Sequence, residues 1–244
     1  TSTGVINDLK TISSYIRGHK KALSIVDCVT SIGACNVPVD EWELDIVASG
    51  SQKGYMIPPG LSFISMSEKA WKASEQSCLP KFYLNLKSYR KSLANNSNPY
   101  TPAVNLVFAL DESLKMMRKE GLKNIFEKHN RHKLAISNAM KKLNLKLFAD
   151  EEYLSPAITA IKTELFDAEE FRKIIKNKFD ILLAGGQDHL KGKIFRIGHL
   201  GYVNDRDIVT VITAITNVLL IQNRISTQQA GEALEEASRF LKVN

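Results

Sequence analysis

Hydrophobic and polar residues alternate along the first third of the chain in a way that predicts one helix followed by three strands. Leu9, Ile12 and Ile16 recur at helical spacing, and Gly18 is a typical residue to end that helix. Short apolar runs bounded by polar or turn residues then predict strands over Ala22–Val26, Asp45–Ala48 and Leu61–Met66. The first of these runs is typical of a parallel strand that is covered on both faces.

The remaining two thirds combine helical spacing with further strands. A long helix that links two domains is predicted by the spacing of Val104, Val107, Phe108, Leu114 and Met117. A second α/β unit follows, with helix Leu122–Leu143, strands at Lys146–Phe148, Ala157–Thr163, Ile181–Ala184 and Ile194–Ile197, a helix capped by Asp167, and a helix that starts at Asn204 or Asp205. We therefore expect a first domain with its linking helix over residues 1–120, a smaller domain over residues 121–222 and a helical extension over residues 223–244.

Composition narrows the class of protein. Hydrophobic residues make up 44% of the chain, which is ample for a packed core, and no apolar run reaches the length that spans a bilayer. The formal net charge of +7 suggests nucleic acid, but acids are interspersed among the bases in stretches such as Lys115–Lys133. We expect a solvated helix face there and neither a nucleic-acid nor a membrane partner. His129 and His132 are interpreted as surface residues, because two histidines without a third ligand rarely bind a metal.

The three cysteines form no C-x-x-C pair, and their number is odd. Neither a disulfide framework nor a metal site is predicted, and a reducing cytoplasm fits. Cys28 is interpreted as a small packing residue.

Lys53 is the first candidate for chemistry. It follows a predicted strand and the turn Ser49–Ser51, and Pro58-Pro59-Gly60 stiffens the chain beyond it. An apolar pocket at such a place keeps an amine partly neutral and nucleophilic, as a lysine that forms an imine requires. Taken alone, a loop lysine is ordinarily solvated.

Asp27 ends the preceding strand, at the edge where open α/β sheets build their sites. A carboxylate that pairs with a protonated pyridine nitrogen, together with an imine-forming lysine, is the minimal equipment for pyridoxal phosphate chemistry. Taken alone, an aspartate at a strand end is more often a turn or cap residue.

Five segments carry a resemblance to a known family: STG at the start, VDCVTSIG, LDIVASGSQKGYMIPPG, NPYTPAVNL and FRIGHLG. In this order, over residues 1 to about 222, the chain resembles the class V aminotransferases. It is most similar to the alanine–glyoxylate and serine–pyruvate or serine–glyoxylate group, whose cyanobacterial members are known as a soluble hydrogenase subunit. The resemblance implies an α/β protein of fold type I, with part of a mostly parallel large-domain sheet and a smaller C-terminal α/β domain.

The resemblance also implies roles for individual residues. Lys53 would hold pyridoxal 5'-phosphate through a Schiff base and act as the catalytic base, and Asp27 would stabilise the pyridinium. The other implied contacts are Val29 against the cofactor ring, Gln52 and Thr1 as polar contacts, Thr101 on the phosphate of a neighbouring subunit's cofactor, and Arg196 on the substrate's α-carboxylate. Some relatives carry a tyrosine three residues before that threonine, where this chain has Asn98, so Asn98 is assigned no phosphate contact.

The implied activity is transamination between a small amino acid, alanine or serine, and glyoxylate or pyruvate, by a cytoplasmic homodimer. The family's phosphate-binding turn has no counterpart in the sequence, since Gly185-Gly186 belongs to another segment. We therefore expect the chain to be the C-terminal part of a longer enzyme. The alternatives are another class V enzyme, a desulfurase or a lyase, and an inactive fragment or assembly subunit. A desulfurase is disfavoured because Gln52, and not histidine, precedes the lysine, and no cysteine follows Cys78.

Overall fold

The structure is a computed structural model that describes residues 2–242. The chain forms two compact units that are discontinuous in sequence. Unit 1 comprises Thr1–Leu9, Thr30–Val37 and Glu120–Asn244, and unit 2 comprises Lys10–Val29 and Pro38–Lys119. None of the helices within residues 2–242 has the length and apolar character needed to cross a membrane.

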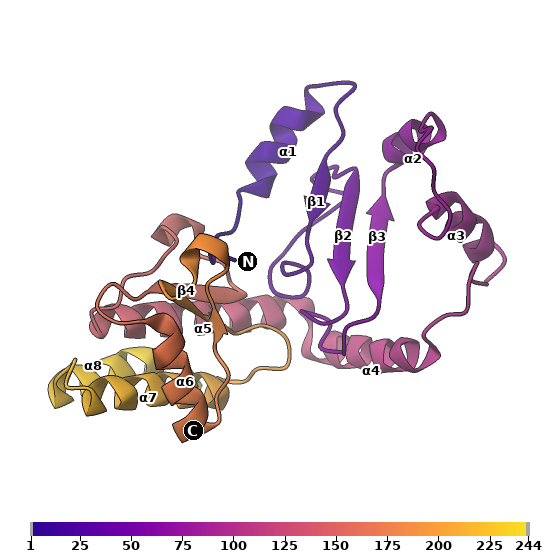
Figure 1. Cartoon of the computed structure of the whole chain (residues 1–244). Helices are drawn as coiled ribbons and strands as arrows, with labels where there is room; N and C mark the ends of the chain where they lie inside the picture. The colour runs from indigo at the N-terminus through magenta and orange to yellow at the C-terminus, as the bar shows by residue number, and fades with distance from the viewer. Residues whose placement is uncertain (1, 243–244) are drawn as a thin grey trace. The chain divides into compact units, whose positions relative to one another are not determined.

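Unit 2 is built on a three-stranded sheet in the order β1-β2-β3 (Figure 1). β1 and β2 pair in parallel, and β3 is antiparallel to β2 because the chain reverses at Pro58-Pro59-Gly60. In chain order the elements are α1 (Leu9–Arg17), β1 (Ile25–Asp27), β2 (Ile46–Gly50), β3 (Ser62–Met66), α2 (Glu68–Glu75), α3 (Leu86–Leu93) and α4 (Val104–Glu120). The sheet is therefore mixed in the described part of the chain.

Three expectations for unit 2 need correction. β1 is not covered on both faces, since it lies at the edge of the sheet and the Ile25 side chain is 73% exposed. α3 has no counterpart among the expected elements, and it buries no residue. α4 forms as expected, but its apolar residues Val104 and Phe108 are exposed, while Ser113 and Met117 are its buried residues.

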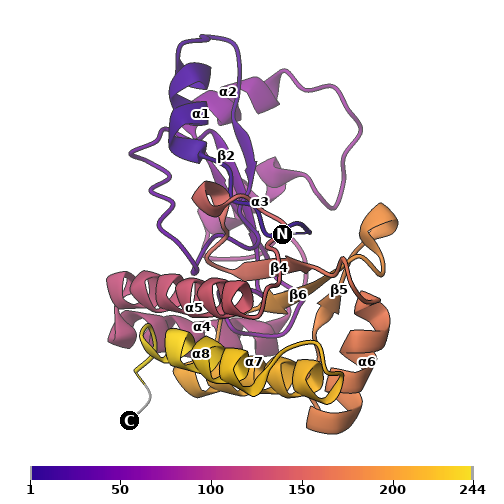
Figure 2. The same cartoon turned by 90° about the vertical axis from the view of Figure 1, so that its left-hand side faces the viewer.

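Unit 1 contains the main hydrophobic core, between helices and an antiparallel sheet in the order β4-β6-β5. Its elements are α5 (Leu122–Lys142), a 3-10 turn η1 (Glu151–Tyr153), β4 (Ile158–Lys162), α6 (Ala168–Phe179), β5 (Ala184–Gly185), η2 (Asp188–Leu190), β6 (Ile194–Gly198), α7 (Asp205–Ile221) and α8 (Thr227–Ser238). α5, α7 and α8 run side by side (Figure 2). The caps of α6 and α7 are Asp167 and Asn204, as the sequence predicts.

Two predicted strands of unit 1 are shorter than expected. Of residues 146–148, only Leu147 forms a bridge, to Ile161. β5 is limited to Ala184–Gly185, because the Leu183 carbonyl accepts a hydrogen bond from the Arg172 Nε–H and not from a strand. Short hydrophobic runs thus indicated the position of these segments but not their pairing.

The segment expected to be an extension, residues 223–244, contains α8, and α8 packs on α5 and α7. It contributes Ala230, Ala233 and Ala237 to the buried interior, where alanine lets helices approach closely. Leu241 completes the same core. The segment is therefore an integral part of the packing of unit 1.

Candidate active site

The carboxyl ends of β1 and β2 place Asp27 and the lysine loop at the same edge of the sheet. Asp27 lies opposite Ala48 in the parallel register, two residues before the end of β2 at Gly50. Its carboxylate is exposed, and Oδ1 accepts a hydrogen bond of 2.9 Å from the Val29 N–H. This bond orients the carboxylate at the end of the strand.

Gly50 brings Val29 and Gln52 together at this edge. A β-carbon at Gly50 would lie 3.0 Å from Gln52 Oε1 and 3.6 Å from Val29 Cγ1. The two side chains therefore meet over the glycine backbone, and a larger residue would push the amide of Gln52 away. Three of the sequence-predicted positions, Asp27, Val29 and Gln52, thus surround one strand end.

Residues 51–61 form a braced loop, which we call the lysine loop. The Ser51 side chain is fully buried; its hydroxyl donates to the Pro58 carbonyl at 2.8 Å and accepts from the Leu61 N–H at 3.2 Å. Within the loop, the Met56 N–H donates to the Lys53 carbonyl at 3.0 Å, and Met56 adopts a φ of 61°. Two cross-links therefore hold the backbone on either side of Lys53.

Tyr55, within the lysine loop, anchors it to neighbouring elements of unit 2. Its ring centroid lies 4.5 Å from that of Phe63 on β3, and its carbonyl accepts a hydrogen bond from the Ser113 hydroxyl of α4. Burial raises the pKa of the Tyr55 phenol. Lys53 itself is half-buried, and within residues 2–242 no hydrogen bond or ion pair engages its amine.

The other predicted site residues belong to other segments of the chain. Thr101 is exposed, in the segment between α3 and α4. Thr1 lies outside the described residues. Arg196 belongs to unit 1, in the centre of its sheet, and its Nε–H donates to the Gly185 carbonyl at 2.8 Å. Burial lowers the pKa of Arg196, and the charge of Arg172 lowers it further.

The prediction that His129 and His132 lie on the surface is wrong, because both are buried, with exposed fractions of 2% and 0%. His129 Nδ1 donates to the Ile125 carbonyl at 2.7 Å, and its Nε2 accepts from the Gly201 N–H at 3.2 Å. A carbonyl can only accept and an amide N–H only donate, so these partners fix the neutral tautomer of His129 with the proton on Nδ1. The loop after β6 is thereby tied to α5.

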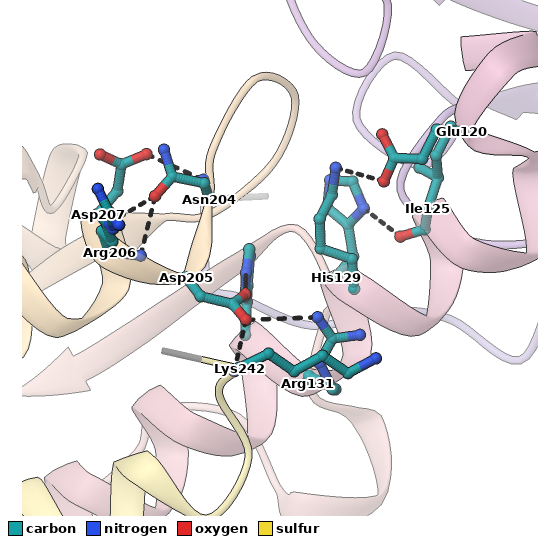
Figure 3. Close-up of polar contacts among 11 residues, drawn as sticks. Glu120, Ile125, His129, Arg131, Asn204, Asp205, Arg206, Asp207 and Lys242 are labelled. Carbon is teal, nitrogen blue, oxygen red and sulfur yellow. Dashed lines mark hydrogen bonds and ion pairs between the residues drawn. The ribbon is translucent and has the colours of Figure 1, made fainter. Parts of the chain in front are cut away.

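His132 takes part in a second set of contacts that converge on Asp205. Figure 3 shows Arg131 and Lys242 against the same carboxylate. One oxygen of this carboxylate accepts from His132 Nε2 at 2.7 Å, and the other lies 3.5 Å from Arg131 and accepts from the Lys242 N–H at 2.7 Å. Burial alone would raise the pKa of Asp205, but these partners lower it below its usual value. Asp205 thus connects α5, the start of α7 and the residues after α8. Helical periodicity does not reveal such contacts, since they join turns far apart in sequence.

A cavity of about 510 Å³ lies at the opposite end of the unit 2 sheet, before β1 and β2. Its most buried acid, Asp45, accepts hydrogen bonds from the Ser24 N–H and the Ser67 hydroxyl and lies 3.6 Å from Lys69. Burial raises the pKa of Asp45, but these bonds and the lysine lower it overall. Asp45 therefore serves to join the strand starts to the N-terminus of α2.

These features define an α/β protein in which a braced loop with a lysine follows the carboxyl end of a parallel strand and an aspartate ends the neighbouring strand. The family model described as aminotransferase class-V matches residues 1–207. The chain belongs to the class V aminotransferase family.

Relatives with known sequences or structures agree with this membership. The chain is 58% identical over 243 residues to the soluble hydrogenase small subunit of Synechococcus sp. (strain PCC 6716), with 100% of this chain and 63% of that protein covered. It is 34% identical over 253 residues to the serine–glyoxylate aminotransferase of Methylorubrum extorquens, with 100% and 62% covered. The ureidoglycine–glyoxylate aminotransferase of Bacillus subtilis superposes with a TM-score of 0.89 at 32% identity, with 98% of this chain and 63% of that chain covered. The chain spans less than two thirds of the length of these relatives.

The fold is that of the fold-type I pyridoxal phosphate enzymes, and pyridoxal phosphate is the cofactor that this family membership implies. The residues at the strand end fit pyridoxal phosphate. They provide an amine in a rigid loop and a carboxylate oriented by a backbone N–H, and Gly50 leaves room for the Val29 and Gln52 side chains to approach each other.

Proposed function

We propose that this chain carries the catalytic lysine of a pyridoxal phosphate-dependent transaminase that exchanges the amino group of alanine or serine with glyoxylate or pyruvate. The observation that carries the proposal is the shared edge of β1 and β2, where Asp27 and the lysine loop end two parallel strands. Two relatives, a serine–glyoxylate and a ureidoglycine–glyoxylate aminotransferase, support glyoxylate as the acceptor.

Lys53 would attach the cofactor and then act as the base. When bound, pyridoxal phosphate supplies an electron sink for the negative charge that develops at the substrate's α-carbon. The Lys53 amine takes up the α-proton and later releases it, which requires a neutral amine at a fixed position. The cross-links of Ser51 and Met56 support such a position, since they limit the movement of the backbone next to Lys53.

Asp27 would keep a proton on the ring nitrogen of the cofactor. Its Oδ1 is oriented by the Val29 N–H, and a carboxylate at this place would stabilise a neighbouring positive charge. Val29 would pack against the ring face, and Gln52 and Thr1 would provide polar contacts. Arg196 would bind the α-carboxylate of the substrate with its planar guanidinium. Thr101 would reach the cofactor phosphate of a neighbouring subunit, which makes a homodimer the proposed assembly.

A Lys53→Ala substitution tests the proposal. We expect transamination by the complete protein to fall by at least about 1,000-fold, because both the attachment point and the base are lost. Turnover is measured with alanine, serine and other amino donors against glyoxylate and pyruvate, together with the visible absorbance of the purified protein. Lys87→Ala, which changes an exposed lysine of α3, is the matched control.

Four results would contradict the proposal, each in a different part. Full turnover in Lys53→Ala would remove this lysine from the mechanism. Release of sulfide or cleavage of a carbon–carbon bond by the unsubstituted protein, without amino transfer, would favour a desulfurase or a lyase. A colourless protein without turnover would favour an assembly subunit, and gel filtration as a monomer would argue against the homodimer.

A further inference from the structure

We propose that Arg172 is a positioning residue that sets the direction of Arg196 through the backbone of Gly185. This inference rests on the proposed function, in which Arg196 binds the carboxylate of the substrate. It concerns three adjacent elements of unit 1: helix α6, the short strand β5 and the central strand β6.

The Arg172 side chain is held at two points. Its Nε–H donates to the Leu183 carbonyl at 2.8 Å, and its Nη1 donates to Glu169 Oε2 at 2.6 Å. The second bond joins positions i and i+3 of α6, and the Arg172 side chain is only 22% exposed. With both bonds made, the guanidinium has a fixed place between α6 and the start of β5.

The ion pair rests directly on Gly185. A β-carbon at Gly185 would lie 2.5 Å from Arg172 Nη1 and 2.6 Å from Glu169 Oε1. The carbonyl of the same glycine accepts the hydrogen bond of 2.8 Å from the Arg196 Nε–H. Arg172 and Arg196 therefore engage the same residue, one by packing and one by a hydrogen bond.

The neighbouring glycine prevents this segment from shifting away. A β-carbon at Gly186 would lie 2.0 Å from the Leu190 carbonyl oxygen, and the Gly186 N–H donates to the Ile194 carbonyl at 3.1 Å. The backbone at Gly186 is thus confined by backbone on the far side. The Arg172–Glu169 pair packs against Gly185, and the backbone of Leu190 packs against Gly186, so the Gly185 carbonyl has little freedom to move. Because the Arg196 Nε–H donates to this carbonyl, the plane of the Arg196 guanidinium is fixed as well.

Charge gives the pair a second effect on the same site. The positive charge of the nearby Arg172 guanidinium contributes to lowering the pKa of Arg196. A carboxylate bound by Arg196 is attracted by both cations, and Glu169 limits this field by pairing with Arg172. A substitution that removes the charge of Arg172 therefore weakens carboxylate binding by geometry and by electrostatics together.

The test compares Arg172→Gln, Arg172→Lys and Glu169→Gln with Lys173→Gln, which removes a charge from the adjacent exposed position of α6. In the complete protein, Arg172→Gln is expected to raise KM for the amino donor about tenfold, in the range of one charge-assisted hydrogen bond, with kcat within about twofold. Arg172→Lys retains the charge but loses the fork, so we expect it to recover only part of the affinity. Lys173→Gln should match the unsubstituted protein.

A second measurement reads the position of Arg196 without any substrate. The ¹⁵N-labelled side chain of Arg196, assigned by its loss in Arg196→Lys, gives an Nε–H signal whose exchange with water is slow while the bond to Gly185 holds. Arg172→Gln should raise that exchange rate about tenfold, and Gly185→Ala should do the same by displacing the ion pair. Equal exchange rates and equal KM in Arg172→Gln and Lys173→Gln would overturn the proposal, also when the melting temperature changes.

The same data separate this inference from the proposed function. If Arg196→Lys leaves KM for the amino donor unchanged, Arg196 does not bind the substrate and the proposed function of that residue fails. The exchange measurement would still decide whether Arg172 positions Arg196. Should Arg172→Gln fail to fold, Arg172→Lys and Gly185→Ala carry both readouts, and normal values in these two variants would equally overturn the proposal.

Discussion

The strand-end edge of unit 2 and the interior of unit 1 use polar residues in opposite ways. At the edge, Asp27 and Lys53 remain accessible, and the buried serine behind them braces the backbone. In unit 1, His129 and His132 are buried and hold segments together through fixed hydrogen bonds. The two sets of polar groups therefore differ in burial and in the partners that they contact. Four experiments sharpen this comparison, each on the 244-residue chain.

The largest effect is expected from removing an aromatic side chain of the unit 1 core. Phe195 is fully buried, with its ring centroid 5.3 Å from that of Phe171. Phe195→Ala should lower the free energy of unfolding by about 3–5 kcal/mol, since it removes apolar contacts and leaves a cavity. Urea denaturation measures the change. Tyr202→Ala, at a side chain that is 79% exposed, should stay within about 0.5 kcal/mol, and equal losses in both variants would contradict the core assignment.

Acid should weaken unit 1 through its histidines. Burial lowers the pKa of His129, His132 and His199, and that of His199 to about 3. In the unfolded chain a histidine titrates near pH 6.5, so the unfolded state binds more protons below that pH. The stability that the neutral histidines provide is fully present above about pH 6.5 and is lost as the pH falls towards 3.

For His199 alone, the expected loss between about pH 6.5 and pH 4 is about 3 kcal/mol. Denaturation midpoints at a series of pH values measure it. His199 lies 2.9 Å from the Thr159 hydroxyl, and His199→Asn keeps a polar group there without a titrating one. The slope of stability against pH should become shallower in this variant, and an unchanged slope would show that other groups cause the acid sensitivity.

A smaller effect is expected at the lysine loop. Ser51→Ala leaves the Pro58 carbonyl and the Leu61 N–H without their buried partner, which should cost about 1–3 kcal/mol. Hydrogen exchange of residues 51–61 should accelerate more than that of β2. Ser97→Ala, at an exposed serine, is the control. Unchanged exchange in Ser51→Ala would mean that the loop does not depend on this hydroxyl.

The smallest effect is expected at the start of α7. Asn204 accepts hydrogen bonds from the N–H groups of Arg206 and Asp207, and Asp207 accepts from the Asn204 N–H in return. Asn204→Ala should cost about 1 kcal/mol and Asn204→Asp much less, as expected for a helix cap. Thermal denaturation of both variants measures the difference, and equal stabilities would show that the cap is not needed here.

Sequence reasoning succeeded where an element depends on local order along the chain: the caps at Asp167 and Asn204 act on the next few residues, as predicted. The turn expected at Ser49–Ser51 is wrong in its bounds, because β2 continues to Gly50 and pairs with Ser62 there. Short motifs in a fixed order likewise predicted the family, and the match of residues 1–207 to the class V aminotransferases confirms it.

Reasoning from the sequence failed where burial depends on distant segments. His129 and His132 stand in a strongly basic stretch, yet they are buried, since Gly201 and Asp205 come to them from the other end of unit 1. The alanines of α8 gave little hydrophobic signal in the sequence. Their contribution is to let α5 and α7 approach α8 closely, which depends on segments that are distant in sequence.

The discontinuous make-up of unit 1 has a consequence for cutting the protein into pieces. Residues before α1 belong to it: the Ser155 N–H donates to the Gly4 carbonyl at 2.9 Å, the Ile6 N–H donates to the Tyr153 carbonyl at 2.8 Å, and a β-carbon at Gly4 would lie 3.0 Å from the Ala160 nitrogen. After a protease cut near residue 120, the segment before α1 would stay with the rest of unit 1 only by non-covalent association. Expression from residue 120 onward would leave the Ser155 N–H and the Tyr153 carbonyl without these partners and would expose the backbone of Ala160 that Gly4 covers.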